Sequence, residues 1–401
     1  MKLSSFTIAF TLLVAFGTLG LAQNNDFVVG KIEQFNSKIL GENRTLYIHV
    51  PRGGKNQPYP VLYLLDGGGF FPLAVSALKL DDGLLPKMII VGISNRRNRS
   101  RDLTPKAYKD LRGSGGGEKF TQFIEKELIP YIDGKFATRP YRTLVGYSLG
   151  GLWAVNALVN HTHLFNNYIV IDPSLRRDKA LQRQMFKALK NKGKFAKKSM
   201  FLAVANTMEG VTKGVDTSNV MQNTSPFTRH IRAGLTLGKV ATHENQSHLQ
   251  FDWKYYPNDG HASVPYSALY HGLRSVFAWY KMDPYDLAKA QDRKTPLKTV
   301  LGIFDKYYAM LSERFGYRVL PEENYLNSLG YMFLETKQSE RAKAFFQMAI
   351  DYYPKSANVY DSMADYYIAQ KDRKKALQHL EKAYKISGDP FHKNRIEKLK
   401  R

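Results

Sequence analysis

Hydrophobic residues follow two different patterns in the first two thirds of the chain. Apolar and polar residues alternate in 27–35 and 45–50, as in strands with one face in solvent, and Gly41 and Asn43 supply turn residues between them. Later apolar runs are continuous, which is typical of strands buried on both faces of a parallel sheet. We therefore predict an antiparallel hairpin followed by a parallel sheet, with strands in 61–65, 88–91, 142–145, 168–171 and 200–204.

Helix-like stretches separate these strands, including 118–132 and 152–159, and a last strand is expected in 251–256. Alternating strands and helices are typical of a doubly wound α/β domain, in which helices cover both faces of the sheet. We expect this domain to occupy residues 23–285.

From about Asp286 the pattern becomes helical only, with a helix expected at 297–315 and a self-match of seven positions at a period of 34 residues. This period resembles tetratricopeptide repeats, in which small residues let paired helices pack closely. We predict an all-α domain over 286–401 with two such repeats, at about 323–356 and 357–390. It either covers the sheet domain or docks a protein or peptide partner. The matched positions are Leu329, Gly330, Phe333, Ala342, Phe346, Ala349 and Pro354, which recur as Met363, Ala364, Tyr367, Ala376, Leu380, Ala383 and Gly388.

The first 22 residues have the pattern of a secretory signal peptide. Lys2 forms a short basic region, 6–16 is apolar, and Ala22 ends a stretch of small residues before Gln23. This segment is short for a membrane anchor. We expect an exported protein, periplasmic or secreted, without a transmembrane anchor once the signal is removed.

Charge and cysteine content narrow the possible functions. The chain contains no cysteine, which excludes a disulfide framework and a lipid-attachment cysteine, and its formal net charge is +24. Ten Lys or Arg residues lie in 176–198, where Leu181, Phe186 and Leu189, with Met185 beside them, recur at roughly helical spacing, so we predict an amphipathic helix with a basic outer face. No nucleic-acid-binding module is recognisable, so we interpret the charge as a solvated surface or as a preference for an anionic ligand.

The segment Gly146-Tyr147-Ser148-Leu149-Gly150 matches the nucleophile elbow G-x-S-x-G. It stands between the strand expected at 142–145 and a helix, and its glycines permit the sharp turn that exposes a serine hydroxyl. Ser148 is therefore the candidate nucleophile.

A serine nucleophile needs a histidine base, and the base needs a carboxylate that orients it. His261 follows the last predicted strand across a tight turn, which is the place of the base in chain order. Glu209 is the first choice for the acid, and Asp216 and Asp172 are the alternatives. Glu209 follows the strand at 200–204, Asp216 lies farther along the same loop, and Asp172 closes the strand at 168–171.

The oxyanion of a tetrahedral intermediate needs backbone N–H donors. Leu149, which follows the nucleophile, is expected to supply one, and Gly67 or Gly68 in the glycine-rich loop after 61–65 the other. That loop lacks the sequence pattern of a nucleotide-binding site, and no metal or organic cofactor is predicted. Tyr147 and Arg101 are candidate substrate-binding residues, although Arg101 could instead pair with its neighbour Asp102 to shape the loop.

Together these motifs resemble the putative esterase family of α/β-hydrolases, which includes esterase D and the ferric siderophore esterases. The similarity covers about residues 31–277. The resemblance implies an α/β-hydrolase fold and hydrolysis of a carboxylic ester by Ser148 and His261, with siderophore or acylated-sugar esters as possible substrates. The alternative is an inactive hydrolase-like scaffold whose repeats dock a partner protein. The resemblance rests on the motifs at 40–44, 63–67, 101–105, 127–132, 146–151 and 260–265.

Overall fold

The structure is a computed structural model that describes residues 28–51, 58–80, 83–208 and 212–401. The expected signal peptide at 1–22 lies outside these residues. No helix in the described part of the chain is long and apolar enough to cross a lipid bilayer.

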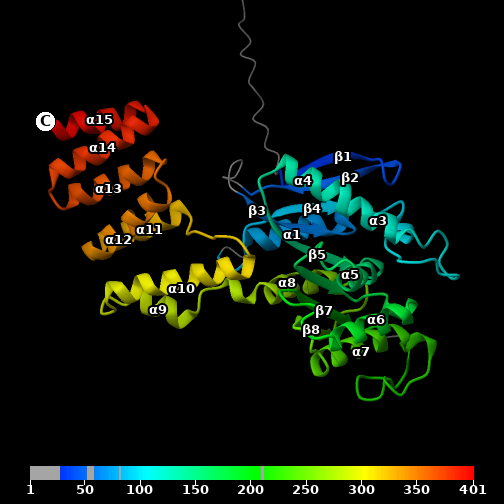
Figure 1. Ribbon diagram of the computed structural model, residues 1–401. Helices are drawn as coiled ribbons and strands as arrows, with labels where there is room; N and C mark the ends of the chain where they lie inside the picture. Colours follow the sequence, from blue (N-terminus) through cyan, green and yellow to red (C-terminus); the bar gives the residue numbers. More distant parts are fainter. Residues whose placement is uncertain (1–27, 52–57, 81–82, 209–211) are drawn as a thin grey trace, which may run out of the picture.

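One eight-stranded sheet forms the centre of the first domain (Figure 1). Its spatial order is β1-β2-β4-β3-β5-β6-β7-β8. The hairpin β1–β2 is antiparallel and joins β4 in antiparallel pairing, whereas all other neighbours are parallel. This confirms the predicted hairpin and parallel sheet. The strands are Lys31–Ser37 (β1), Glu42–His49 (β2), Tyr59–Leu64 (β3), Ile89–Ile93 (β4), Thr138–Tyr147 (β5), Asn167–Ile171 (β6), Ser199–Ala205 (β7) and Gln250–Tyr256 (β8).

Helices cover both faces of this sheet, so its central strands are fully buried. Alternate residues of β3 show the division: Val61 and Tyr63 join the core on one face, and Leu62 and Leu64 the core on the other. The first face carries Gly117–Phe123 (α3), Ile129–Lys135 (α4), Leu149–Asn160 (α5), Lys179–Lys190 (α6) and Arg229–His243 (α7), and the second Gly67–Leu80 (α1) and Val264–Val276 (α8).

Short helical turns connect these elements. A single helical turn, Arg99–Asp102 (α2), follows β4, and a π-helix, Ile124–Leu128 (η1), links α3 to α4. The 3₁₀ turns are Leu175–Arg177 (η2), Pro226–Thr228 (η3) and Ala278–Tyr280 (η4).

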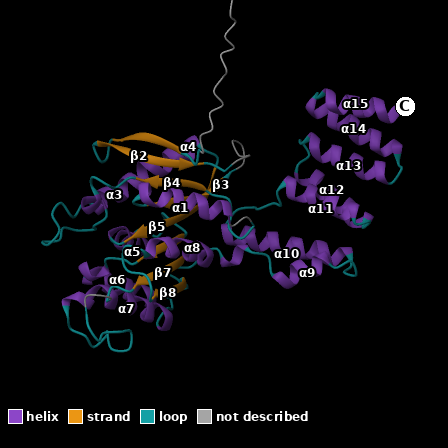
Figure 2. Cartoon of the chain, turned by 180° about the vertical axis from the view of Figure 1, so that it is seen from behind, coloured by secondary structure: helices purple, strands orange, loops and turns teal. Residues whose placement is uncertain are grey.

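The C-terminal region is entirely helical, as predicted, and forms an array beside the sheet domain (Figure 2). Its two hairpins, α11–α12 and α13–α14, begin at residues 323 and 357, and their second helices begin at 339 and 373, so both pairs are offset by 34 residues. The helices are Pro284–Gln291 (α9), Leu297–Phe315 (α10), Glu323–Glu335 (α11), Ser339–Tyr352 (α12), Ala357–Ala369 (α13), Arg373–Ser387 (α14) and Pro390–Lys400 (α15).

Helix α10 joins the two regions by packing as well as by sequence. Leu311 and Phe315 belong to the hydrophobic core beneath α1 and α8. The Phe315 ring makes an edge-on contact with Tyr141 of β5 at 4.9 Å. The helical array is therefore fixed to the second face of the sheet by shared apolar burial.

Two local predictions need adjustment. The glycine-rich segment expected as a loop forms the first turn of α1, which begins at Gly67. The basic amphipathic helix is confirmed but shorter than the basic run: α6 ends at Lys190 and buries Leu181, Met185 and Leu189.

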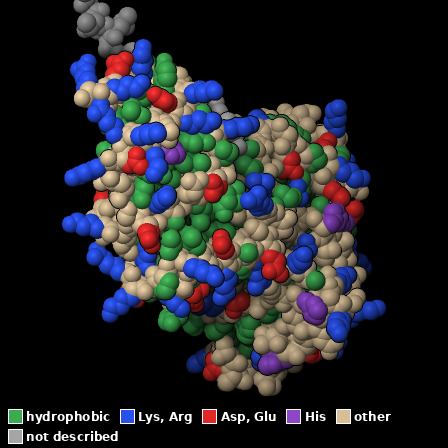
Figure 3. Space-filling model, turned by 60° about the vertical axis from the view of Figure 1, so that its left-hand side comes forward, with side chains coloured by type: hydrophobic (Ala, Val, Ile, Leu, Met, Phe, Trp, Pro, Cys, Tyr) green, Lys and Arg blue, Asp and Glu red, His purple; other side chains and the backbone are tan. Residues whose placement is uncertain are grey.

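In the space-filling view, Lys and Arg side chains project around a more central area of hydrophobic ones (Figure 3).

Candidate active site

Ser148 lies on a strained turn between β5 and α5. Its backbone has φ 56° and ψ −112°, a conformation that non-glycine residues rarely adopt, and its side chain is nearly buried. The turn is tight enough that a Cβ atom on Gly146 would lie 2.3 Å from the carbonyl oxygen of Gly150. The turn that lifts Ser148 out of the sheet therefore requires glycine at position 146, whereas a Cβ on Gly150 would make only ordinary contact with Leu65, at 3.5 Å.

His261 lies in the loop between β8 and α8 and reaches Ser148. Its Nε2 atom is 3.1 Å from the Ser148 hydroxyl oxygen. The Tyr147 hydroxyl donates to the carbonyl oxygen of His261 at 2.8 Å, and the two rings lie 4.8 Å apart. Tyr147 thus holds the histidine loop against the nucleophile turn.

Asp172 completes a hydrogen-bonded chain with these two residues. It follows β6, is 2% exposed, and its Oδ2 atom lies 2.5 Å from His261 Nδ1. Its Oδ1 atom accepts the backbone N–H of Ala205 at 3.1 Å, so the carboxylate is fixed from the neighbouring strand. Among the three carboxylates considered from the sequence, this is the one that the structure places against His261.

Asp216 is not part of this chain of contacts. The Asp216 side chain is exposed and accepts hydrogen bonds from the backbone and hydroxyl of Ser218. Glu209, the first choice from the sequence, lies outside the described residues.

A second histidine, which sequence reasoning missed, also contacts Asp172. His230, on the first turn of α7, places its Nε2 atom 3.0 Å from the same Oδ2 atom. Burial by itself raises the pKa of Asp172, but the hydrogen bonds and positive charge of His230 and His261 outweigh it and lower the pKa to about 2. Asp172 is therefore ionised at neutral pH.

Ser174 is another residue that the sequence did not single out. Its hydroxyl lies 3.2 Å from that of Ser148, and its backbone N–H donates to the Ser148 carbonyl at 2.9 Å. The signal was weak, because a serine two residues after a strand is common. Ser174 holds the nucleophile turn in place from the loop that also carries Asp172.

A cavity of about 720 Å³ opens in front of Ser148 and His261. Gly68 and Tyr147 lie in its wall together with further aromatic and basic side chains, which include Tyr47, Phe70, Arg96, Arg99 and Tyr266. The Ser148 hydroxyl thus faces a partly aromatic space that carries two guanidinium groups.

Two helix N-termini meet beside Ser148. Leu149 is the first residue of α5, and Gly67 and Gly68 are the first two of α1. N–H groups in the first turn of a helix have no partner within it, so these can donate to a bound oxyanion. Gly68 lines the cavity, whereas Gly67 packs against Gly92, where an added Cβ would lie 2.5 Å from backbone atoms. Gly68 and Leu149 are the better placed pair of donors.

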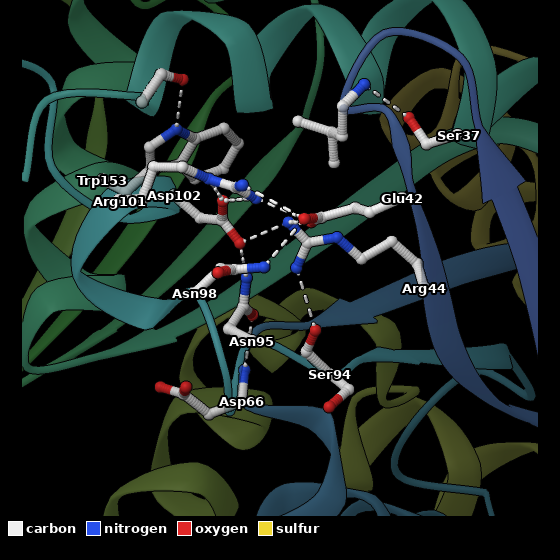
Figure 4. A network of polar contacts seen from close by, with 12 residues as sticks. Ser37, Glu42, Arg44, Asp66, Ser94, Asn95, Asn98, Arg101, Asp102 and Trp153 are labelled. Carbon is white, nitrogen blue, oxygen red and sulfur yellow. Dashed lines mark hydrogen bonds and ion pairs between the residues drawn. The ribbon is translucent and has the colours of Figure 1, made fainter. Parts of the chain in front are cut away.

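Arg101 is held in a polar network rather than in the cavity wall (Figure 4). Its guanidinium pairs with Glu42 at 2.6 Å and with Asp102 at 2.8 Å. Asp102 is fully buried and also pairs with Arg44 at 2.6 Å. Of the two roles considered for Arg101, the structure shows the pairing that shapes the loop.

This network reaches the wall of the site through Asn95. The Asn95 side-chain amide donates to Asp102 at 3.2 Å, and its oxygen accepts the backbone N–H of Asp66 at 3.2 Å (Figure 4). Asp66 directly precedes the glycines of α1. The buried ion pairs therefore fix the position of the α1 N-terminus.

Arg99 connects the two walls directly. Its guanidinium makes a two-pronged contact with the Asp66 carboxylate, at 2.9 and 3.0 Å, and donates to the carbonyl oxygen of Tyr147 at 3.0 Å. One side chain thus links the segment before Gly67 to the residue before Ser148. Arg101, not Arg99, was singled out from this segment of the sequence.

Asp172, His230 and His261 hold donor atoms within 4.8 Å of one another. Each of these atoms takes part in a short hydrogen bond within the cluster, and His261 also contacts Ser148. We interpret the cluster as a hydrogen-bonded network that needs no bound ion.

Comparisons with known proteins agree with this fold. The putative esterase family matches residues 37–291. The ferri-bacillibactin esterase BesA of Bacillus subtilis is 31% identical over 182 residues, which cover 39% of this chain and 63% of that protein. The siderophore triacetylfusarinine C esterase of Aspergillus fumigatus is 32% identical over 131 residues, covering 29% of this chain and 45% of that protein.

Among solved structures, an IroE-like serine hydrolase from Shewanella oneidensis is 31% identical with a TM-score of 0.64, covering 80% of this chain and 99% of that one. The chain spans less than two thirds of the two curated relatives named above. The family match, in contrast, extends over more than half of this chain and includes Ser148, Asp172 and His261. The chain belongs to the putative esterase family of α/β-hydrolases.

Proposed function

We propose that this protein is a serine esterase that hydrolyses carboxylic esters through an acyl-enzyme. The observation that carries the proposal is the continuous hydrogen-bonded chain from Ser148 through His261 to the buried, ionised Asp172. Because an ionised carboxylate only accepts hydrogen bonds, His261 must carry its proton on Nδ1. Its Nε2 atom is then free to accept the proton of Ser148.

The reaction follows from these positions. The Ser148 oxygen attacks the ester carbonyl carbon while its proton passes to His261 Nε2. The carbonyl oxygen becomes an oxyanion that accepts hydrogen bonds from the backbone N–H groups of Leu149 and Gly68. His261 then protonates the leaving alcohol as the tetrahedral intermediate collapses to the acyl-enzyme. Water, activated by the same Nε2 atom, releases the acid and restores Ser148.

The cavity supports an aromatic or anionic ester as substrate. Tyr47, Phe70 and Tyr266 offer ring faces, and Arg96 offers an exposed positive charge. Two relatives are siderophore esterases by name, acting on ferri-bacillibactin and on triacetylfusarinine C. We therefore place siderophore esters first among substrates and acylated sugars second.

A fluorophosphonate probe tests the proposal, because it labels an activated serine covalently. Wild-type protein should be labelled and should hydrolyse para-nitrophenyl esters, and Ser148→Ala should do neither. Ser174→Ala serves as the matched control, since its hydroxyl is close by but lies outside the proposed proton path. Equal labelling of wild type and Ser148→Ala would refute the assignment.

The C-terminal helices and the N-terminal segment carry two lesser proposals. We propose that 323–356 and 357–390 are tetratricopeptide-like repeats, which the 34-residue offset of the hairpins supports, and that they dock a peptide or protein. The sequence pattern of residues 1–22 supports export. Affinity capture with wild-type protein and with a variant altered on the surface of 357–390 tests the docking role.

A further inference from the structure

His230 is a partly buried histidine that the proposed reaction does not use. Its side chain is 14% exposed, and its ring stands edge-on to that of His261, with centroids 5.2 Å apart. It comes from α7 and is not among the residues that line the cavity, whereas His261 is. A histidine in this position is rarely needed for packing alone, because an apolar side chain would fill the same space without a polar cost.

The contacts of Asp172 define what His230 does to it. Oδ1 accepts one backbone N–H, from Ala205, and Oδ2 accepts both His261 Nδ1 at 2.5 Å and His230 Nε2 at 3.0 Å. Both imidazoles must donate, since the carboxylate can only accept. The Asp172 carboxylate is therefore held by three donors from three different segments.

We propose that His230 is a positioning residue that fixes the Asp172 carboxylate and draws part of its negative charge away from His261. The kinetic part of this inference rests on the proposed esterase function. His230 touches neither the nucleophile nor the cavity, and its effect passes through Asp172.

His230 acts on His261 in two ways, and both lower the pKa of His261. A carboxylate that also accepts a hydrogen bond from His230 stabilises the His261 imidazolium less than a carboxylate that accepts a hydrogen bond from His261 alone. At mildly acidic pH a protonated His230 would also repel a positive charge on His261, 5.2 Å away. Removing His230 should therefore raise the pKa of His261.

Further ionisable side chains lie on the elements packed around His230 and His261. They include Tyr147 of β5, Arg176 and Arg177 of η2, Arg229, Arg232, Lys239 and His243 of α7, Asp252, Lys254, Tyr255 and Tyr256 of β8, and Asp259 before His261. Burial, together with the nearby Asp172, raises the pKa of Tyr147 to about 12. The titration experiment below therefore follows the His261 imidazole itself and compares it between variants.

Two variants separate positioning from a merely structural role. His230→Leu removes the donor, whereas His230→Gln keeps an N–H that can reach Asp172. For His230→Leu we expect kcat on a para-nitrophenyl ester to fall on the order of tenfold, with KM within about twofold, as when a group that orients a functional side chain is lost. The acid limb of the kcat/KM profile should move to higher pH. His230→Gln should recover most of kcat, and its acid limb should move less.

A readout without turnover keeps this test distinct from that of the esterase function. The His261 imidazole is titrated by NMR in wild type, His230→Leu and His230→Gln, and thermal unfolding checks that each variant is folded. The pKa of His261 should rise most in His230→Leu. If wild type is not labelled by fluorophosphonate, the esterase proposal fails, yet a raised pKa of His261 would still support the link through Asp172.

Two results would overturn the inference. One is an unchanged His261 titration in His230→Leu together with wild-type kcat. The other is an equal loss of kcat and of melting temperature in both variants with the His261 titration unchanged, which would make His230 structural. If His230→Leu does not fold, His230→Ala, which also removes the donor, takes its place: a His261 titration and a kcat equal to those of wild type in that variant count against the inference.

Discussion

His261 Nδ1 lies 2.5 Å from Asp172 Oδ2, although the two residues are 89 positions apart in the chain. The parallel sheet explains this contact, because β6 and β8 both end at the same edge, with β7 between them. Asp172 leaves β6 with φ 38°, which turns its side chain back toward the edge. The proposed acid therefore follows β6, the strand that directly neighbours β5, which carries the proposed nucleophile at its end.

Asp172→Asn should lower kcat on a para-nitrophenyl ester by about 10³ to 10⁴, because an amide favours the wrong His261 tautomer and cannot stabilise the imidazolium. Steady-state kinetics and the rate of fluorophosphonate labelling measure the loss. Asp216→Asn is the matched control and should retain wild-type kcat. A reversed result, with Asp172→Asn active and Glu209→Gln inactive, would return the role of the acid to Glu209.

Asp172 should also make stability depend on pH. Its folded-state pKa, lowered to about 2, lies below that of an ordinary aspartate, so the folded protein binds this proton more weakly than the unfolded chain. The resulting stabilisation, about 2 kcal/mol, is present above about pH 4 and lost as pH falls toward 2. Urea unfolding should show the difference in stability between wild type and Asp172→Asn narrowing over that interval. A difference that stays constant with pH would contradict the assignment.

Arg99→Gln should reduce kcat by about tenfold, because the link between Asp66 and the carbonyl of Tyr147 sets the distance between the two oxyanion donors, and small displacements of such groups are costly. KM for a neutral ester should change little. Arg97→Gln, an exposed neighbour outside the cavity wall, is the control. Wild-type kcat in Arg99→Gln would show that the backbone alone fixes the donors.

Arg96→Gln should raise KM for esters with an anionic acyl group by about threefold to tenfold and leave neutral esters unaffected, because its exposed guanidinium faces the cavity. The comparison uses paired substrates that differ in one carboxylate, at low and high salt. The effect should shrink in high salt, since exposed charges are screened. Equal changes for both substrates would rule out charge recognition by Arg96.

Gly330→Ala should destabilise the helical array by about 1 to 3 kcal/mol, because the new Cβ would lie 2.4 Å from the Phe346 ring where α11 and α12 cross. Gly302→Ala in α10 is the matched control, since no atom lies within 4 Å of its Cβ position, and it should be neutral or stabilising. Thermal unfolding of both variants measures the contrast. Similar melting temperatures would show that the two helices can separate slightly without cost.

Much of the fold was predictable because burial imposes simple periods on the sequence. The continuous apolar runs became the central strands, and the helix expected at 297–315 has those bounds in the structure. The glycine-rich segment at 67–69 was harder, because glycine is typical of loops and its place in a helical first turn depends on contact with Gly92 of β4. That contact joins strands and helices distant in sequence.

The site was predictable where a role depends on local geometry. Ser148 and His261 stand at turns that the sequence marks with glycines. The role of Asp172 depends on β6 and β8 ending at the same edge of the sheet with β7 between them, and that of His230 on how α7 packs, so neither has a local signal. Arg99 and Arg101 differ only in the direction of their side chains around one short helical turn, which composition does not reveal.

Phe315 couples the stability of the sheet domain to that of the C-terminal helices. Its ring lies against Tyr141 of β5 and, at 5.0 Å, against Trp279, although the sequence pattern changes near residue 286. A chain cut at that change would leave Tyr141 and Trp279 facing water on the sheet's second face. The repeats and the hydrolase domain should accordingly melt as one cooperative unit, and evolution could exchange the outer hairpins more freely than the helix that anchors them.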